Sequence, residues 1–234
     1  MSDNFHQPYF LPAENTRRVV LCVHGLLGSA GEFREIAQAL HQQGINVKAL
    51  CLPGHGGGGR AFIQSGISAW QAYIDRSVEE LVQQYDQVFL IGHSMGGQLA
   101  LRAAVHYPLN GVITLNTPLR THVTLKQIIL GLRVLFTPAQ HDDPILHTYR
   151  ISFSVDPQPI WALPAWLPRM ADVLKLNKLT RAALEHITAP VLIFQTQKDE
   201  TVHPKSAAML AAGLVHAPHQ IILLKNSMHA WFAP

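Results

Sequence analysis

One short stretch, Gly92-His93-Ser94-Met95-Gly96, constrains the fold of this chain more than any other. It follows the apolar run 88–91, which is typical of a strand buried on both faces, and it precedes small and apolar residues at helical spacing. A G-x-S-x-G pattern between a strand and a helix predicts a sharp turn that holds the serine at strained dihedrals with its hydroxyl above the sheet. We therefore expect a helix from about Met95 and a nucleophilic hydroxyl at Ser94.

On either side of this turn, short apolar strands alternate with amphipathic helices, which is the pattern of a mostly parallel sheet covered by helices on both faces. A length of 234 residues with 48% hydrophobic residues suits one compact α/β domain. The expected strands cover residues 5–10, 18–23, 45–50, 87–91, 111–115, 190–195 and 220–224. Two capping boxes, Ser29 with Glu32 and Ser68 with Gln71, predict helix starts, and further helices are expected over 179–187 and 204–212.

The alternation stops over residues 119–178, so we expect a lid inserted between two parts of the core, 1–118 and 179–234. Prolines and tryptophans near residues 157–168 predict a rigid extended stretch with little regular structure. Apolar residues at helical spacing between 125 and 136 must be buried against something. Ordinary packing and the wall of a pocket for a hydrophobic group are both compatible with this pattern. The pocket-lining candidates in the lid are Ile128, Leu132 and Trp161.

Two later loops follow neighbouring strands and carry Asp199 and His229. Because the carboxyl ends of parallel strands meet at one edge of a sheet, both loops should open beside Ser94. A serine hydroxyl needs a base to remove its proton, and an imidazole serves well when a carboxylate fixes its tautomer. The sequence therefore predicts that Ser94, Asp199 and His229 act together.

Other acids and histidines are weaker candidates for these roles. Glu200 is one residue farther round the turn than Asp199, and residues 116–118, which directly follow the next expected strand after Ser94, contain no carboxylate. The competing histidines lie at a helix start or before the last strand, not on the loop after it. They are His203, His216 and His219.

The segment 23–28, Val-His-Gly-Leu-Leu-Gly, follows the first firmly predicted buried strand. The backbone N–H groups of Leu26 and Met95 could together hold a carbonyl oxygen as it becomes negative. Gly25 and His93 are candidates for the lining of the same site. By side-chain alternation, His93 should point away from the serine, in a structural or pocket-lining role.

Four stretches, 23–29, 92–97, 197–202 and 226–229, together resemble α/β-hydrolases of the thermophilic-carboxylesterase and monoacylglycerol-lipase group. The resemblance spans nearly the whole chain. It implies an α/β-hydrolase fold and hydrolysis of short- to medium-chain carboxylic esters without a cofactor. By the same resemblance, Ser94 is the nucleophile, Asp199 the acid, His229 the base, and Leu26 and Met95 provide the oxyanion amides.

This resemblance leaves other activities open and shows one departure. Monoacylglycerol lipase, thioesterase, acyltransferase and perhydrolase activities use the same residues, and a catalytically silent binding protein would keep the fold. The family usually continues from the histidine into a final helix, whereas only residues 230–234 follow His229 here.

Composition excludes several other classes of function. The net charge of +3 comes from scattered residues, so we expect no nucleic-acid partner. There is no leader pattern and no apolar run near 18 residues, from which we expect a cytoplasmic protein without membrane insertion. Cys22 and Cys51 belong to apolar runs and are expected as reduced, buried thiols.

No cofactor or metal is expected. The glycine-rich loop 53–59 lacks the Lys-Ser/Thr of a phosphate-binding loop. A loose group at residues 141–147, with two histidines and two aspartates, lacks recognised metal-ligand spacing. The expected partner is a small-molecule ester with an apolar acyl group, and the sequence leaves the oligomeric state open.

Overall fold

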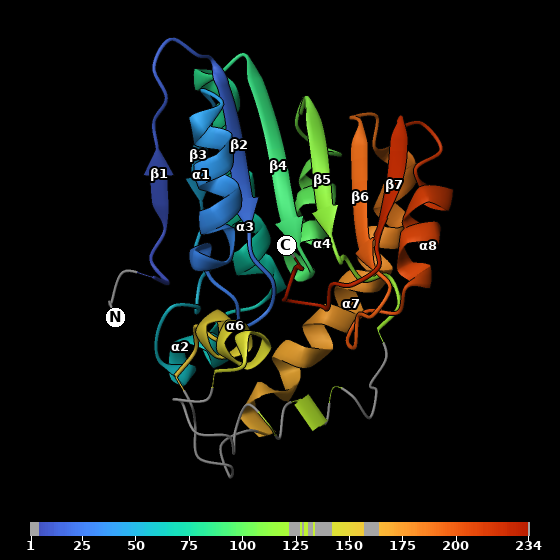
Figure 1. Cartoon of the computed structure of the whole chain (residues 1–234). Helices are drawn as coiled ribbons and strands as arrows, with labels where there is room; N and C mark the ends of the chain where they lie inside the picture. Colours follow the sequence, from blue (N-terminus) through green and yellow to red (C-terminus); the bar gives the residue numbers. More distant parts are fainter. Residues whose placement is uncertain are drawn as a thin grey trace.

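The computed structural model describes residues 5–121, 127, 129, 130, 133, 142–156 and 164–233. Within these residues a seven-stranded sheet runs in the order β1-β3-β2-β4-β5-β6-β7 (Figure 1). The strands are β1 Tyr9–Leu11, β2 Arg18–Val23, β3 Asn46–Ala49, β4 Gln87–His93, β5 Gly111–Leu115, β6 Val191–Thr196 and β7 His219–Leu224. All neighbouring strands are parallel except β1, which pairs antiparallel with β3. The predicted mostly parallel α/β sheet is confirmed.

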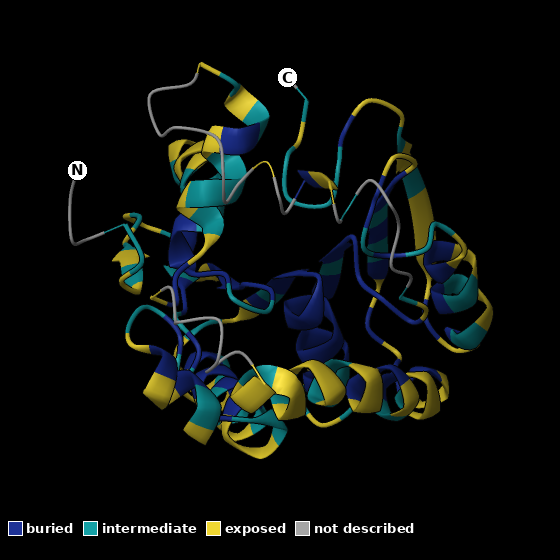
Figure 2. Cartoon of the chain, turned by 90° about the horizontal axis from the view of Figure 1, so that it is seen from below, coloured by how far each residue is buried: buried dark blue, intermediate teal, exposed yellow. Residues whose placement is uncertain are grey.

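Helices cover both faces of the sheet. The described helices are η1 Ala30–Phe33, α1 Arg34–Gln42, α2 Gly59–Gln64, α3 Ile67–Gln84, α4 Met95–Ala103, α6 Pro144–Ser152, α7 Leu167–Ala183, η3 Leu184–His186 and α8 Lys205–Gly213. Of these, α2 and α6 lie beyond the carboxyl ends of the strands (Figure 1). Alternate side chains of β2 enter two cores: Val20 and Cys22 belong to a cluster with Phe33 and Ala37 of α1, whereas Leu21 belongs to a larger cluster that includes residues of α3, α4, α7 and α8. Helix α4 is buried along almost its whole length (Figure 2). The turn at residue 94 is therefore held between a central strand and a buried helix.

The predicted helix start at Ser29 is confirmed, but the Glu32 half of its capping box does not form, and the predicted box at Ser68 is wrong. The Ser29 hydroxyl does accept a hydrogen bond from the N–H of Gly31, but the Glu32 carboxylate turns away from the cap and bonds to His93. Ser68 lies inside α3, which begins at Ile67 after Gly66. The Glu32 carboxylate thus pairs with a remote histidine instead of completing the capping box, while Ser29 still caps the helix.

The stretch before residue 179 is more helical than the sequence predicted. Helix α7 starts at Leu167, and Pro168 fits in its first turn because a helix leaves that N–H without a partner in any case. Its buried side includes Asn177 and Thr180 as well as Leu176, so a purely apolar pattern was absent. Helix α6 was not predicted, although Asp143 caps it by accepting the N–H groups of residues 145 and 146, and a proline follows.

The lid remains a prediction, as does the division into 1–118, 119–178 and 179–234. Ile128, Leu132 and Trp161 lie outside the described residues. Within the residues that are described, no helix combines the length and apolarity needed to cross a bilayer. Cys22 is buried as expected, whereas Cys51 is only half-buried.

Candidate functional site

The turn at Ser94 has the strained geometry predicted from the sequence. Strand β4 ends at His93, α4 begins at Met95, and Ser94 between them has φ 52° and ψ −120°. A residue other than glycine rarely adopts such backbone dihedrals unless the surrounding structure holds it there. A Cβ on Gly92 would lie 2.4 Å from the Cα of Gly97, so a larger residue would push α4 off its strand. The predicted strand–turn–helix is confirmed.

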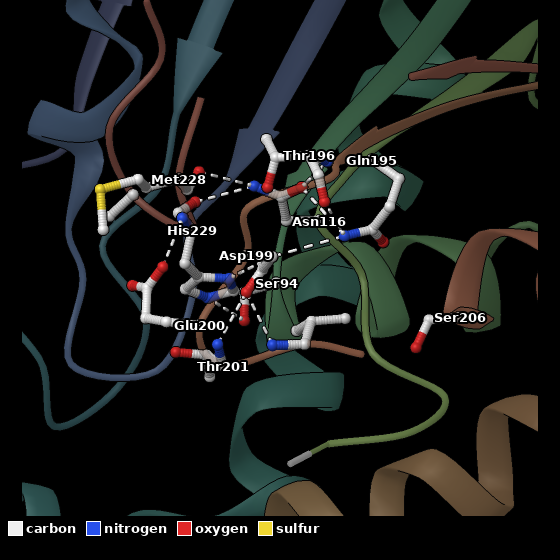
Figure 3. Close-up of polar contacts among 12 residues, drawn as sticks. Ser94, Asn116, Gln195, Thr196, Asp199, Glu200, Thr201, Ser206, Met228 and His229 are labelled. Atoms are coloured by element: carbon white, nitrogen blue, oxygen red, sulfur yellow. Dashed lines mark hydrogen bonds and ion pairs between the residues drawn. The ribbon is translucent and has the colours of Figure 1, made fainter. Parts of the chain in front are cut away.

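Ser94, His229 and Asp199 form one hydrogen-bonded chain (Figure 3). The Oγ of Ser94 lies 3.1 Å from the Nε2 of His229, and the Nδ1 of His229 lies 3.0 Å from the Oδ2 of Asp199. The other oxygen of Asp199 accepts the N–H groups of Thr201 and Val202 at 2.8 and 2.7 Å. The carboxylate is therefore fixed by the turn after β6 and points one oxygen at the imidazole.

The electrostatic environment of these three hydrogen-bonded residues suits proton transfer. Burial alone would raise the pKa of Asp199, but the adjacent His229 and the backbone N–H groups keep it below its usual value. Burial likewise opposes the charged form of His229, yet the Asp199 carboxylate raises the pKa of this imidazole. A carboxylate at Nδ1 selects the tautomer with its proton there, which leaves the Nε2 lone pair facing Ser94. The arrangement can take a proton from the serine hydroxyl.

The loop that carries His229 is anchored by its backbone. The side-chain amide of Asn116 donates to the carbonyl oxygens of His229 and Met228 at 2.9 and 3.2 Å, and its Oδ1 accepts the N–H of Thr196 at 2.8 Å (Figure 3). The N–H of Met228, just before the histidine, donates to the carbonyl oxygen of Trp231, just after it, at 2.7 Å. The role of Asn116 was not predicted from the sequence, where residues 116–118 were considered only as a place for the acid. The available signal was an asparagine directly after an apolar strand, since asparagine tolerates the left-handed φ of 48° that Asn116 has here.

Glu200 contacts His229 at a different point from Asp199. One oxygen of Glu200 accepts the backbone N–H of His229 at 3.2 Å, and the other accepts the hydroxyl of Tyr149 in α6. Burial and the neighbouring Glu200 raise the pKa of Tyr149, which therefore stays a hydrogen-bond donor. Tyr149 was not identified from the sequence, because nothing along the chain links α6 to this loop.

The segment after β2 approaches the serine closely. A Cβ on Gly25 would lie only 3.1 Å from the Cβ of Ser94, so a larger residue there would crowd the serine. The N–H of Gly28 closes a turn onto the carbonyl of Gly25 at 3.1 Å, with Leu27 at φ 61°. Met95 is the first residue of α4, where a helix provides no partner for the N–H group. Binding of an oxyanion by the N–H groups of Leu26 and Met95 stays a prediction.

His93 lies against the loop of the candidate base. Its ring packs against the ring of His229 with 5.0 Å between centroids, and its Nε2 lies 3.0 Å from the carbonyl oxygen of His229. These contacts give His93 a structural role, while a role in lining a substrate pocket stays a prediction. Two of the rival histidines bond locally instead: His203 to the N–H of Lys205 and His219 to the carbonyl of Ala217.

Elsewhere in the described part of the chain, no cluster of three His, Cys, Asp or Glu residues is placed to hold a metal ion. In the loose group at 141–147, His141 lies outside the described residues. Asp143 is occupied as the cap of α6 and bonds to Arg133 at 2.8 Å.

This chain is similar to known proteins over most of its length. The model of the Hydrolase_4 family, described as serine aminopeptidase, S33, matches residues 14–233. The chain is 28% identical over 227 residues to the thermostable monoacylglycerol lipase of Bacillus sp. (strain H-257), covering 95% of this chain and 86% of that protein. It is 21% identical to the carboxylesterase of Bacillus subtilis (strain 168), covering 82% and 76% of the two chains.

A solved structure of the metagenome-derived lipolytic enzymes LipS and LipT has a TM-score of 0.77 at 23% identity, covering 97% of this chain and 90% of that one. This likeness shows the fold. The α/β-hydrolase fold implied by the sequence resemblance is therefore confirmed.

Proposed function

Because the chain belongs to the Hydrolase_4 family and is a serine hydrolase acting on ester bonds, we propose that it is a carboxylesterase for short- to medium-chain esters. The observation that carries this proposal is the hydrogen-bonded chain from Ser94 through His229 to Asp199, with distances of 3.1 and 3.0 Å. A serine at strained dihedrals with a base in reach is the arrangement that acyl transfer requires.

In the proposed reaction, the Oγ of Ser94 attacks the ester carbonyl while the Nε2 of His229 takes the hydroxyl proton. The carbonyl oxygen becomes negative and is held by the N–H groups of Leu26 and Met95. Protonated His229 then gives the proton to the leaving alcohol, and an acyl-enzyme remains on Ser94. In the second half, His229 takes a proton from water, which attacks the acyl group; protonated His229 then returns the proton to the Oγ of Ser94 as the acid leaves.

Ester hydrolysis fits the site better than the aminopeptidase activity in the description of the family. A substrate with a free α-amino group calls for a carboxylate at the site. Of the carboxylates beside the histidine loop, Glu32 bonds to His93, and Glu200 bonds to Tyr149 and to the N–H of His229. Among the residues that the structure describes, both of these carboxylates are thus engaged within the protein, which favours a substrate without an α-amino group.

A second candidate is monoacylglycerol hydrolysis. The relative that matches 95% of this chain is a monoacylglycerol lipase. Its chemistry on the same three residues would be identical, and the two candidates differ only in the alcohol that leaves.

The test is a parallel set of substrates given to the same preparation. It comprises p-nitrophenyl esters from acetyl to decanoyl, the matching thioesters, 1-monoacylglycerols of the same acyl lengths, and aminoacyl p-nitroanilides. We expect the highest kcat/KM among the oxygen esters, with Ser94→Ala inactive on all of them. A higher kcat/KM on monoacylglycerols than on aryl esters would favour the second candidate. A higher kcat/KM on thioesters or anilides than on oxygen esters would refute the carboxylesterase proposal.

A further inference from the structure

His93 lies between two hydrogen-bond acceptors. Its Nδ1 is 2.9 Å from the Oε2 of Glu32, and its Nε2 is 3.0 Å from the carbonyl oxygen of His229. The side chains of His93 and Glu32 are only 8% and 12% exposed, so water does not readily replace either contact. A neutral imidazole has one N–H and can satisfy one acceptor, whereas an imidazolium satisfies both. With a neutral ring, one nitrogen lone pair would face an oxygen lone pair at hydrogen-bonding distance.

Glu32 itself is held as a carboxylate. Burial opposes its ionisation, but His93 beside it and the backbone N–H of Gly25 lower the pKa of Glu32. Its other oxygen, Oε1, lies against the turn at residues 25–28: a Cβ added to Gly28 would be 1.8 Å from this oxygen. Glu32 therefore contacts both His93 and the segment that carries Leu26.

The other histidines near Glu32 do not provide the matching positive charge. His24 is buried, its Nδ1 donates to the carbonyl of Gly25 at 2.8 Å, and its Nε2 accepts the N–H of Leu52 at 2.8 Å. That pattern requires a neutral ring, and burial lowers the pKa of His24. Burial also lowers the pKa of His6, whose Nδ1 bonds to the hydroxyl of Ser29.

From this geometry we infer that Glu32 and doubly protonated His93 form a buried ion pair that positions the base and the oxyanion segment together. The imidazolium of His93 holds the carbonyl of His229, and the carboxylate of Glu32 holds the imidazolium and the turn that begins at Gly25. Both are positioning residues, since they act through His229 and the backbone of Leu26. The inference rests on the proposed function only for its kinetic test, because the protonation of His93 can be measured without any substrate.

The first test is nuclear magnetic resonance of the whole protein with ¹⁵N-labelled histidine rings, with His93 assigned by through-bond correlations. We expect both ring nitrogens of His93 to carry protons near neutral pH, and one of them to lose its proton in Glu32→Gln. A neutral His93 ring in the parent protein would overturn the ion pair, whether or not the protein hydrolyses esters.

The second test is kinetic and uses the near-isosteric change Glu32→Gln. Glu35→Gln removes the same charge from an exposed position on α1 and serves as the matched control. We expect Glu32→Gln to lower kcat on the order of tenfold with little change in KM, because substrate contacts remain while the base is less well placed. Glu35→Gln should behave as the parent protein does.

A double-mutant cycle separates positioning from general stability. If the two residues act as one unit, Glu32→Gln combined with His93→Gln should lower kcat no further than the worse single variant. Effects that multiply, or a Glu32→Gln variant with full kcat, would overturn the inference. Should a variant fail to fold, the proton count on His93 in the parent protein still decides the question.

Discussion

The side-chain amide of Asn116 donates a hydrogen bond to the backbone carbonyl of His229 at 2.9 Å, and this bond spans the ends of two strands that are not neighbours in the sheet. Asn116 follows β5, and His229 lies on the loop after β7. The oxygen of the same side-chain amide accepts the N–H of Thr196 at the end of β6. One side chain thus connects the strand ends that carry the candidate acid and base.

Replacing this amide should impair activity and stability together. We expect Asn116→Ala to lower kcat about tenfold and the free energy of unfolding by about 1–3 kcal/mol, since buried partners lose their hydrogen bonds. Asn110→Ala is the matched control, because Asn110 also bonds a strand backbone, accepting the N–H of Val88 at 2.8 Å, but far from Ser94. Thermal melts and kinetics on both variants decide it. If Asn110→Ala lost as much kcat at equal loss of stability, Asn116 would have no special role.

A second prediction concerns covalent labelling. A fluorophosphonate should add one phosphonyl group at Ser94, because this hydroxyl faces the Nε2 of His229. Ser94→Ala should lower turnover by about 10³-fold or more and leave the melting temperature nearly unchanged. Intact and peptide mass spectrometry locate the label. A label on any other serine would refute the assignment.

The sequence was sufficient to predict elements whose signal is local. The G-x-S-x-G turn and strands such as β2 and β5 were predicted with their residues, because apolar runs and glycine positions mark them directly. Helix α7 was only partly predicted, because its buried side includes Asn177 and Thr180 beside Leu176. A stripe that mixes polar and apolar residues does not stand out in a hydropathy pattern.

The contacts that position the site could not be read from the sequence. Asn116 meets His229, and Tyr149 meets Glu200, only after the strands and α6 are assembled. Glu32 looked like half of a capping box because local patterns cannot reveal a partner 61 residues away. Identifying such partners requires the fold.

The third prediction separates the two adjacent acids. Asp199→Asn should lower kcat by about 10⁴-fold, because an amide at this position favours the wrong tautomer of His229. Glu200→Gln should keep much of the activity, since its amide oxygen can still accept the N–H of His229. Steady-state kinetics on the two variants, with circular dichroism to check folding, is sufficient. A larger loss of kcat in Glu200→Gln than in Asp199→Asn would assign the role of the acid to Glu200 instead.

The fourth prediction concerns pH. His229 must be neutral to act as a base, and Asp199 raises the pKa of this imidazole above its ordinary value of about 6.5. On the acid side, kcat/KM should therefore be half-maximal at a pH above about 6.5 and should rise with pH through that point. The residual activity of Asp199→Asn should have its acid limb at lower pH, because the charge that favours imidazolium is gone.

The same pair links pH to stability, with opposite signs for its two members. A raised pKa in the folded state means that protonated His229 stabilises the fold at low pH, and this contribution is lost as pH rises through the folded pKa. The lowered pKa of Asp199 means that its contribution is present at neutral pH and is lost as pH falls through the folded pKa. In the kinetic measurement, an acid limb of kcat/KM in Asp199→Asn at the same pH as in the parent protein would contradict the electrostatic coupling between Asp199 and His229.

The last prediction tests the acyl pocket that the sequence places in the lid. Each methylene buried against an apolar wall contributes about 0.8 kcal/mol, or roughly fourfold in kcat/KM. The kcat/KM for butanoyl or hexanoyl esters should therefore be about one to two orders of magnitude higher than that for acetyl esters. Ile128→Ala and Leu132→Ala should each shift the optimum toward longer acyl groups if these residues form the wall. If they serve packing alone, the variants should instead melt at lower temperature and keep the parent's profile. Chain-length profiles measured beside thermal melts distinguish the two, and a flat profile from acetyl to decanoyl in the parent protein would refute the pocket.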